Sequence, residues 1–305
     1  MTELRLGFGL PVAGSWASAD NVAEIAETAE AHGFDSLWTF QRLLVPAEGS
    51  WGPAYRAVQD PLISLAYAAA RTSRIRLGVA VLNAPFYPPL VLAKQLTTLD
   101  RLSGGRLDTG LGIGWAHEEF AAVGADKAGR GQRLEEFIEC LRAIWGDDPV
   151  RFAGASYQVP PARIQPKPIQ QPPPILLGGG AERALRRAGR LADGWISASR
   201  HELSQLPATI QTIRSGAVEA GRDPDRLRIV IRGVLDLGDE RRGPDRRLLQ
   251  GSPEQVHQDL DRLAEYGATE VFLDLNFDPQ VSSPDGDATS AMNYAREVLR
   301  DFGRN

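Results

Sequence analysis

Short apolar runs alternate with longer segments of helical periodicity along almost the whole chain. The runs have the length of buried strands, and the longer segments repeat their apolar residues at the spacing of an amphipathic helix. This pattern predicts strands at residues 4–10, 34–40, 75–82, 106–114, 174–179, 193–198, 227–237 and 269–277. It predicts helices at residues 21–32, 60–72, 88–103, 116–124, 130–146, 180–191, 203–221, 253–266 and 289–303.

Residues at several boundaries support these limits. Asp20 is a typical N-cap for the first helix, and Gly33 ends that helix. Pro61 suits the first position of the second helix, because an N–H at that position would have no intrahelical partner in any case.

Eight strands that are each followed by a helix predict an α/β fold, the closed (β/α)8 or TIM barrel. The rival is an open doubly wound sheet, which usually carries a glycine fingerprint after its first strand. This chain has "GFGLPVAG" at that position, which is not the Rossmann pattern. Residues 147–174 are rich in proline and interrupt the alternation, so we expect an excursion with a small hairpin before the fifth strand. The length suits one barrel, and we expect a single domain over residues 1–305.

Composition and charge narrow the class of protein. Apolar residues make up 43% of the chain and charged residues 24%, which is typical of a soluble globular protein. The net charge of −5 argues against a nucleic-acid partner, since such proteins carry a basic face. A single cysteine, Cys140, excludes an internal disulfide and favours a cytoplasmic protein. We see no signal peptide, no apolar run that spans a membrane and no histidine cluster that indicates a metal site.

The active site of such a barrel lies at the carboxyl ends of its strands, which directs attention to the loops that follow them. The loop after the second strand, residues 41–59, is unusually long and contains Trp51 and Tyr55. It fits either a wall over the substrate or a surface excursion at a dimer contact.

Two glycine-rich strand ends are candidate binding elements. Gly178, Gly179 and Gly180 separate the fifth strand from a basic helix, whose first N–H groups have no intrahelical partner and attract an anion. A tight turn beside a solvated basic helix is the alternative. The fourth strand ends in "GLGIGW", residues 110–115, where alternating glycines leave room for a flat ring or satisfy a crowded barrel interior.

Four stretches together resemble the bacterial luciferase-like flavin and deazaflavin oxidoreductases. They are "GFDSLWTFQRLLVP", "RIRLGVAVLNAPFYPP", "QLTTLDRLSGGRLDTGLGIGW" and "LLGGGAERALRRAGRLADGW", in the order and spacing of that family. Within the family, the chain is most similar to the actinobacterial branch that uses coenzyme F420. The resemblance covers nearly the whole chain and implies a luciferase-like TIM barrel.

The resemblance implies where a cofactor would lie. The phosphate would bind the amides of Gly178, Gly179 and Gly180. A non-proline cis peptide bond in the third strand, here between Ala80 and Val81, would support the ring from behind.

The resemblance also assigns residues around the ring and the substrate. Gly114 and Trp115 would flank the ring from the fourth strand. Many relatives carry an Asp-His pair at the end of the second strand, where this chain has Gln41 and Arg42. Gln41 can hydrogen-bond a ring carbonyl or N–H, whereas Arg42 cannot act as an acid near neutral pH. Arg42 instead suits an anionic substrate or developing negative charge, and a salt bridge at the barrel rim is the alternative.

His117 is the predicted replacement proton donor, because it follows the fourth strand and titrates near neutral pH. The alternative is that it only belongs to the first turn of the helix beginning near residue 116.

The function that follows is a coenzyme F420-dependent oxidoreductase, which transfers a hydride between the deazaflavin C5 and a small organic substrate. An FMN-dependent monooxygenase and a non-catalytic barrel subunit are the alternatives. The arginines of "ERRGPDRRLL", residues 240–249, fit either the polyglutamate tail of F420 or a solvated loop. We also expect a homodimer, which is common in the family, and neither a nucleic-acid nor a membrane partner.

Overall fold

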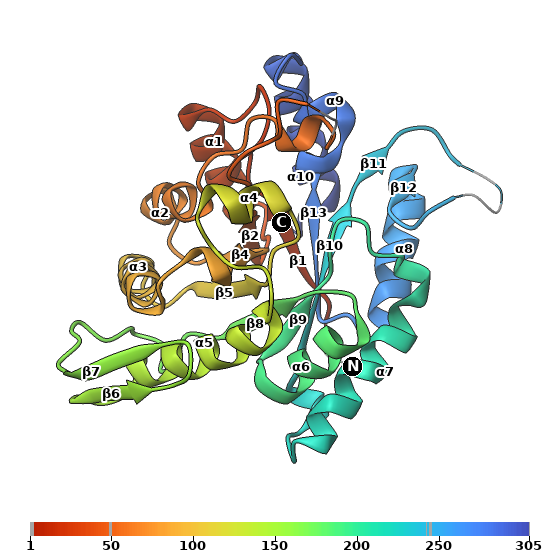
Figure 1. Ribbon diagram of the computed structural model, residues 1–305. Helices are drawn as coiled ribbons and strands as arrows, with labels where there is room; N and C mark the ends of the chain where they lie inside the picture. Colours follow the sequence, from red (N-terminus) through yellow and green to blue (C-terminus); the bar gives the residue numbers. More distant parts are fainter. Residues whose placement is uncertain (1–2, 49–50, 242, 244–245, 305) are drawn as a thin grey trace.

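A ring of parallel strands forms the centre of the computed structural model, which describes residues 3–48, 51–241, 243 and 246–304 (Figure 1). Within the described residues, eight strands close into a barrel in the order β3-β2-β1-β13-β10-β9-β8-β5, with β5 paired to β3. These strands are β1 (Arg5–Gly9), β2 (Ser36–Thr39), β3 (Arg76–Val79), β5 (Leu107–Gly112), β8 (Ile175–Gly178), β9 (Gly194–Ile196), β10 (Arg228–Val234) and β13 (Glu270–Asp274). The predicted closed parallel barrel is confirmed.

Helices cover the outside of the barrel, and every predicted helix is present. They are α1 (Ala19–Ala31), α2 (Pro61–Arg71), α3 (Pro89–Leu102), α4 (His117–Ala122), α5 (Arg130–Trp145), α6 (Glu182–Leu191), α7 (Leu206–Glu219), α8 (Pro253–Glu265) and α10 (Ala288–Phe302), with a short α9 (Pro279–Ser282). The predicted N-cap Asp20 is wrong. Ser18 caps α1 instead, because its extended backbone lets its hydroxyl accept from the N–H of Asn21.

Short 3-10 turns occupy several of the connections. They are η1 (Pro53–Tyr55), η2 (Ala84–Phe86), η3 (Leu203–Gln205), η4 (Pro224–Arg226) and η5 (Leu275–Phe277). Two of them, η1 and η5, follow β2 and β13 at the carboxyl ends of the barrel strands and so help to shape the candidate site.

Three features depart from the simple alternation of strand and helix. The proline-rich segment contains the predicted hairpin, formed by β6 (Val150–Ala153) and β7 (Gln158–Ala162), which extends away from the barrel (Figure 1). The third strand is interrupted after Val79 and resumes as β4 (Leu82–Asn83), and the bond between Ala80 and Val81 is cis, as the resemblance implied. The seventh strand continues as β11 (Asp236–Leu237), which pairs with β12 (Gln250–Gly251).

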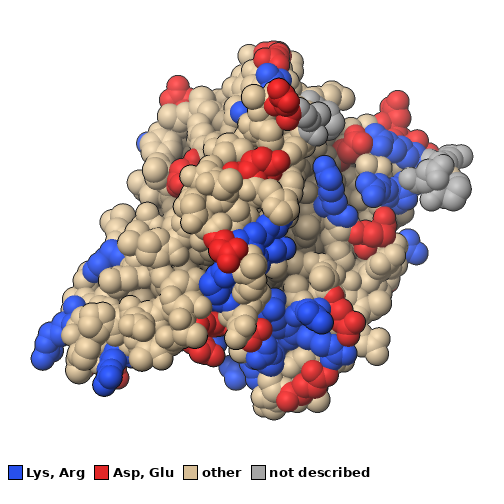
Figure 2. All heavy atoms as spheres, in the orientation of Figure 1, with Lys and Arg blue, Asp and Glu red and all other residues tan. Residues whose placement is uncertain are grey.

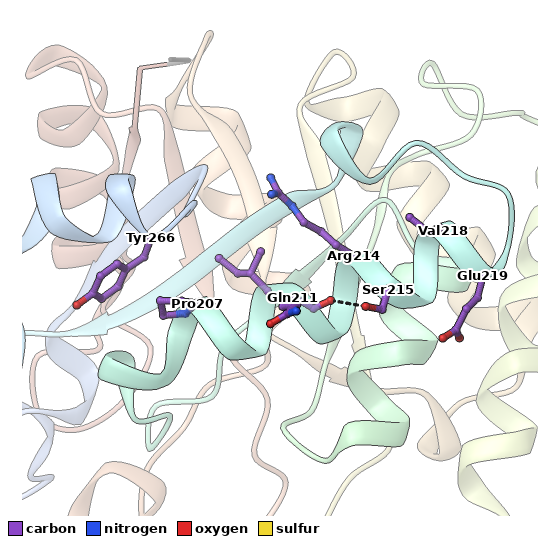
Figure 3. A pocket seen from close by; sticks show the side chains of 8 residues that line it. Pro207, Gln211, Arg214, Ser215, Val218, Glu219 and Tyr266 are labelled. Carbon is purple, nitrogen blue, oxygen red and sulfur yellow. Dashed lines mark hydrogen bonds between the residues drawn. The ribbon is translucent and has the colours of Figure 1, made fainter.

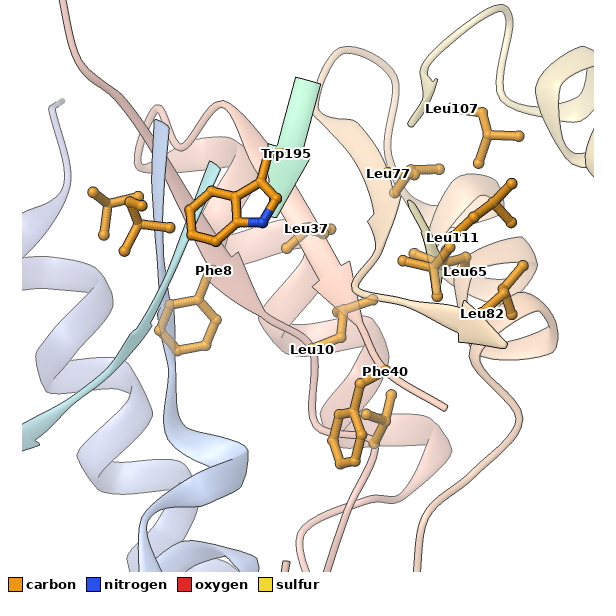
Figure 4. Close-up of a cluster of buried hydrophobic side chains, with 14 of the residues drawn as sticks. Phe8, Leu10, Leu37, Phe40, Leu65, Leu77, Leu82, Leu107, Leu111 and Trp195 are labelled. Carbon is orange, nitrogen blue, oxygen red and sulfur yellow. The ribbon is translucent and has the colours of Figure 1, made fainter. Parts of the chain in front are cut away.

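Two apolar layers hold the barrel together. The larger lies between the sheet and the helices and includes the buried Phe8, Leu37 and Leu77 (Figure 4). The smaller fills the barrel interior, where the rings of Trp38 and Phe272 stack with their centroids 5.2 Å apart. Full burial of each such side chain stabilises the fold by roughly 1.5–3 kcal/mol.

A charged layer closes the barrel at the amino ends of its strands. Asp108, which is fully buried, accepts hydrogen bonds from Arg76 and Arg228, and Arg228 also pairs with the buried Glu270. Burial works against ionisation of Asp108, but these two guanidinium groups outweigh it and lower the pKa of the carboxyl group to about 2. This layer lies away from the loops that are expected to carry chemistry.

Two kinds of feature are absent from the described residues. None of their helices has the length and apolar character to cross a membrane. In the same part of the chain, no group of histidine, cysteine and acidic side chains is arranged to hold a metal ion.

Candidate active site

A cavity of about 390 Å³ opens at the carboxyl ends of the barrel strands. Its walls come from the ends of β2, β3, β5, β8, β9 and β10, from the start of α5 and from the turn after β13. All predicted site residues except His117 line it: Gln41, Arg42, Ala80, Val81, Gly114, Trp115, Gly178, Gly179 and Gly180. The predicted residues, which are widely separated in the chain, therefore meet at one place.

His117 is the exception. It is the first residue of α4, and its side chain is exposed. The buried residues of α4 are Glu119 and Phe120, and His117 does not belong to the described lining of the cavity. The proton-donor hypothesis for His117 therefore has no geometric support.

The glycine turn after β8 presents free N–H groups to the cavity. Gly179 has φ 123°, a conformation that side chains other than glycine rarely adopt. The helix that follows has no side-chain N-cap, and among the described residues the N–H groups of Gly180 and Ala181 donate to no atom. Unpaired amides at the positive end of a helix make an anion site.

The glycines of the fourth barrel strand have a different explanation. A Cβ atom at Gly110 would lie 1.9 Å from the carbonyl oxygen of Val79, and one at Gly112 would lie 2.6 Å from Val81 Cγ2. These residues are small because the barrel interior is crowded there. Gly114, with φ 68°, is the member of the series that turns the chain into the cavity wall.

Cationic side chains surround the mouth of the cavity. Arg130 lines it, and its Nε is buried without a partner. Arg183 and Arg200 are exposed nearby, on α6 and just after the β9 end. None of the three forms an ion pair within the part of the chain that the structure describes. Figure 2 shows basic side chains gathered over α6, beside this opening.

Gln41 is held in place by its neighbours. Its side-chain oxygen accepts from the N–H of Asn83 at 2.8 Å, and its nitrogen donates to the hydroxyl of Tyr87. Burial raises the pKa of Tyr87 to about 12, so this hydroxyl stays protonated. One N–H of Gln41 remains for a bound ring.

Arg42 forms an ion pair, as the alternative interpretation predicted, but the pair is buried. Its Nη1 lies 2.8 Å from Glu119 Oε2, and both side chains are almost inaccessible to solvent. The Arg42 guanidinium carbon also lies 4.8 Å, 4.9 Å and 5.3 Å from the ring centroids of Trp115, Tyr55 and Trp51. Burial lowers the pKa of Arg42, and Glu119 opposes that effect. The guanidinium is thus held by the Glu119 carboxylate and by cation–π contacts with these three rings.

The cavity-lining residues of the loop after β2 favour the wall interpretation of that loop. Tyr55 lines the cavity, and Trp51 packs against Trp115 with centroids 4.8 Å apart. Residues 49–50 of the loop lie outside the described residues.

Arg232 is a site residue that the sequence interpretation missed. It lies on β10, is buried, and donates to the carbonyl of Ala80 at the cis bond. Its Nε is 3.4 Å from Asp274 and has no hydrogen-bond partner, and the ring of Phe277 lies 5.0 Å from its guanidinium carbon. The sequence did contain a signal for this residue, an arginine within the apolar run "RIVIRGV". A charge in a buried strand is costly unless it is paired, so an arginine there indicates more than packing.

The family model described as luciferase-like monooxygenase matches residues 6–243. The chain belongs to this family. Luciferase-like relatives include an uncharacterised protein of Mycobacterium tuberculosis, which is 31% identical over 290 residues and covers 90% of this chain and 92% of its own.

Two named relatives of the luciferase-like protein use different cofactors. The F420-dependent glucose-6-phosphate dehydrogenase of Nakamurella multipartita is 32% identical over 232 residues, covering 74% of this chain and 66% of its own. The FMNH2-dependent dimethylsulfone monooxygenase of Pseudomonas putida is 34% identical over 155 residues, covering 50% and 42%. The protein is therefore a flavin- or deazaflavin-dependent oxidoreductase, and the alternative of a non-catalytic subunit falls away.

The luciferase-like fold is also shared with solved structures. A monooxygenase from Streptomyces bottropensis superimposes with a TM-score of 0.77 at 22% identity, covering 98% of both chains.

The luciferase-like barrel has a second hollow, of about 490 Å³, on the outer side of α7 (Figure 3). It is lined by side chains of α7 and by Tyr266, and it includes no residue from the strand ends. We assign it no role in the chemistry, because neither unpaired amides nor orphaned guanidinium groups face it.

Proposed function

We propose that the protein is a coenzyme F420-dependent oxidoreductase that transfers a hydride between the deazaflavin C5 and a small organic substrate. The observation that carries the proposal is the glycine turn after β8, where the free amides of Gly180 and Ala181 line the same cavity as Arg130. Arg130 donates from Nη1 to the carbonyl of Lys127, but its buried Nε has no partner among the described residues. Amides and a guanidinium together suit the phosphate of the cofactor.

The cationic mouth favours F420 over FMN. F420 carries an anionic polyglutamate tail beyond its phosphate, and Arg183 and Arg200 are exposed cations without a carboxylate partner among the described residues. The F420-dependent relative also matches 74% of this chain, whereas the FMNH2-dependent relative matches 50%.

The basic loop at residues 240–249 does not add to this argument. Arg241, Arg246 and Arg247 pair with Asp236, Asp259 and Glu202 respectively, so their charges are already compensated. Residues 242 and 244–245 of that loop lie outside the described residues.

The residues of the cavity have separate tasks in this proposal. The amides after β8 and Arg130 hold the phosphate, and Ala80, Val81, Gly114 and Trp115 line the space for the ring. The bound deazaflavin supplies the hydride chemistry. The apolar rings of Phe40 and Phe277 exclude water from the path of that hydride.

Isothermal titration calorimetry with F420 and with FMN tests the proposal. We expect saturation by F420 and a loss of about 10–150-fold in F420 affinity for Arg130→Ala, which is the effect of removing a hydrogen bond to a charged group of roughly 1.5–3 kcal/mol. The control is Arg214→Ala on the outer side of α7, which should bind F420 like the original protein. Saturation by FMN alone would reverse the choice of cofactor, and saturation by neither would remove the proposed function.

We propose further that the protein acts as a homodimer that pairs through α2 and α3. Six of its large apolar side chains are unusually exposed on this side: Ile63, Tyr67, Leu90, Val91, Leu102 and Ile169. Ile63 and Leu102 are 73% and 69% exposed and line a shared groove between the two helices. Such a concentration is typical of a surface that another chain covers.

A further inference from the structure

Reduction of a polar double bond needs a proton as well as a hydride, and the described cavity offers few donors. Its ionisable lining residues are Arg42, Tyr55, Arg130 and Arg232, with no histidine, lysine, cysteine or carboxylate among the described lining residues. Arginine does not release its proton in proteins. Tyr55 is therefore the ionisable residue of the described lining that can donate a proton.

The position of Tyr55 is set by the loop that roofs the cavity. Tyr55 ends the turn η1, and the loop beyond it is tied down by a β-bridge between Val58 and Ala13. Arg56, the next residue, pairs with Asp285 at 2.7 Å. These contacts hold the ring of Tyr55 against Phe277, with centroids 5.7 Å apart.

The hydroxyl of Tyr55 is available for a ligand. It forms no hydrogen bond within the part of the chain that the structure describes, and it is not among the buried polar atoms that lack a partner. By contrast, the hydroxyl of Tyr87 is already engaged by Gln41.

The charges around Tyr55 favour a developing anion. The guanidinium carbon of Arg42 lies 4.9 Å from the Tyr55 ring centroid, and Arg232 lines the same cavity. Glu119 and Asp274 pair with these two arginines, whereas Arg130 in the cavity wall forms no ion pair among the described residues. Every charged side chain that lines the described cavity is cationic. Fixed positive charge stabilises both a phenolate that has given up its proton and an oxygen that gains negative charge.

We propose that Tyr55 is the catalytic proton donor and that the substrate is a carbonyl compound, an inference that rests on the proposed function. When bound, the reduced cofactor would supply the hydride that forms a C–H bond at the carbonyl carbon, and the C=O π electrons would move to oxygen. That oxygen takes the phenol proton of Tyr55, forming an alcohol and a phenolate. Water at the open mouth would return a proton to the phenolate, and the hydroxide left behind would take up the proton that the reduced cofactor releases together with its hydride. The two electrons of the reduction would come from that cofactor.

The test compares the original protein with Tyr55→Phe, which removes only the hydroxyl, and with Tyr266→Phe as a matched control. Tyr266 lies in the hollow on α7, away from the cavity (Figure 3). Calorimetry first gives the F420 and FMN affinities of all three proteins. Infrared difference spectroscopy then records the carbonyl stretch of 13C-labelled acetophenone bound to each cofactor-free protein. Finally, single-turnover absorbance follows oxidation of whichever reduced cofactor binds by a panel of ketones and aldehydes.

We expect the three proteins to have equal cofactor affinities. The carbonyl stretching frequency should be lower in the original protein and in Tyr266→Phe than in Tyr55→Phe. Reduction should be slowed by about 10²–10⁴-fold in Tyr55→Phe alone. An unchanged stretch or an unchanged rate in Tyr55→Phe would overturn the role of Tyr55. Failure of the original protein to bind or reduce any carbonyl probe would overturn the substrate class. Absence of cofactor binding would instead refute the proposed function, and the infrared comparison would still decide the contact with Tyr55.

Discussion

Replacing Asp108 by asparagine (Asp108→Asn) removes the buried negative charge that pairs with two partly buried arginines. Asp108 accepts from Arg76 at 2.6 Å and 2.9 Å and from Arg228 at the same two distances. Lowering a pKa from 3.8 to about 2 corresponds to about 2.5 kcal/mol of stabilisation of the ionised form. Removing one partner of a buried pair typically costs 3–5 kcal/mol, so we expect a loss within that range.

Urea unfolding followed by circular dichroism measures this loss. The control is Glu24→Gln, whose pair with Arg296 is largely exposed and should contribute less than about 1 kcal/mol. Because the folded-state pKa of Asp108 is depressed, its stabilisation is complete above pH 3.8 and disappears as the pH falls toward 2. The difference between the two proteins should therefore be constant near neutral pH and shrink between roughly pH 4 and pH 2. A loss below about 1 kcal/mol at pH 7 would refute this account of the charged layer.

Three further outcomes follow from the structure. Glu119→Gln should lower the free energy of unfolding by about 3 kcal/mol, because it leaves Arg42 buried without its carboxylate; an unchanged melting temperature would contradict that pairing. Gly179→Ala should cost about 1–3 kcal/mol in a thermal melt, because of its φ of 123° and a 2.8 Å approach to Ala184. Gly180→Ala, whose Cβ meets nothing within 4 Å, should melt like the original protein, and equal losses for the two would exclude backbone strain as the cause. Leu102→Lys should convert the dimer to a monomer in sedimentation equilibrium, and the same mass for both proteins would argue against the α2–α3 interface.

Much of the barrel could be read from periodicity, because each strand is a short apolar run and each helix a longer amphipathic one. The predicted ends of helices and strands are wrong where the backbone conformation determines them. Ser18 and Asp20 are both good N-cap residues, and only the extended backbone at Ser18 selects it. Similarly, the apolar run at residues 75–82 hides the interruption between β3 and β4.

The site was less predictable, because its electrostatics depend on pairs that are distant in the chain. Glu119 stands 77 residues from Arg42, and no local pattern connects them. The place of His117 after a strand predicts a proton donor, but whether the side chain faces the cavity depends on the rotation of a six-residue helix. In the sequence, Tyr55 is one aromatic residue in a long loop, and its neighbours in the cavity come together only when that loop folds over the strand ends.

The contact between Trp51 and Trp115 gives the protein an intrinsic optical reporter at its entrance. Indole emission overlaps the absorption of flavins and deazaflavins, and an energy acceptor seated below these two rings would quench them strongly. Cofactor binding at the mouth of the cavity can therefore be followed by intrinsic tryptophan fluorescence. Replacing Trp51 by phenylalanine would show how much of the quenching comes from this pair of rings.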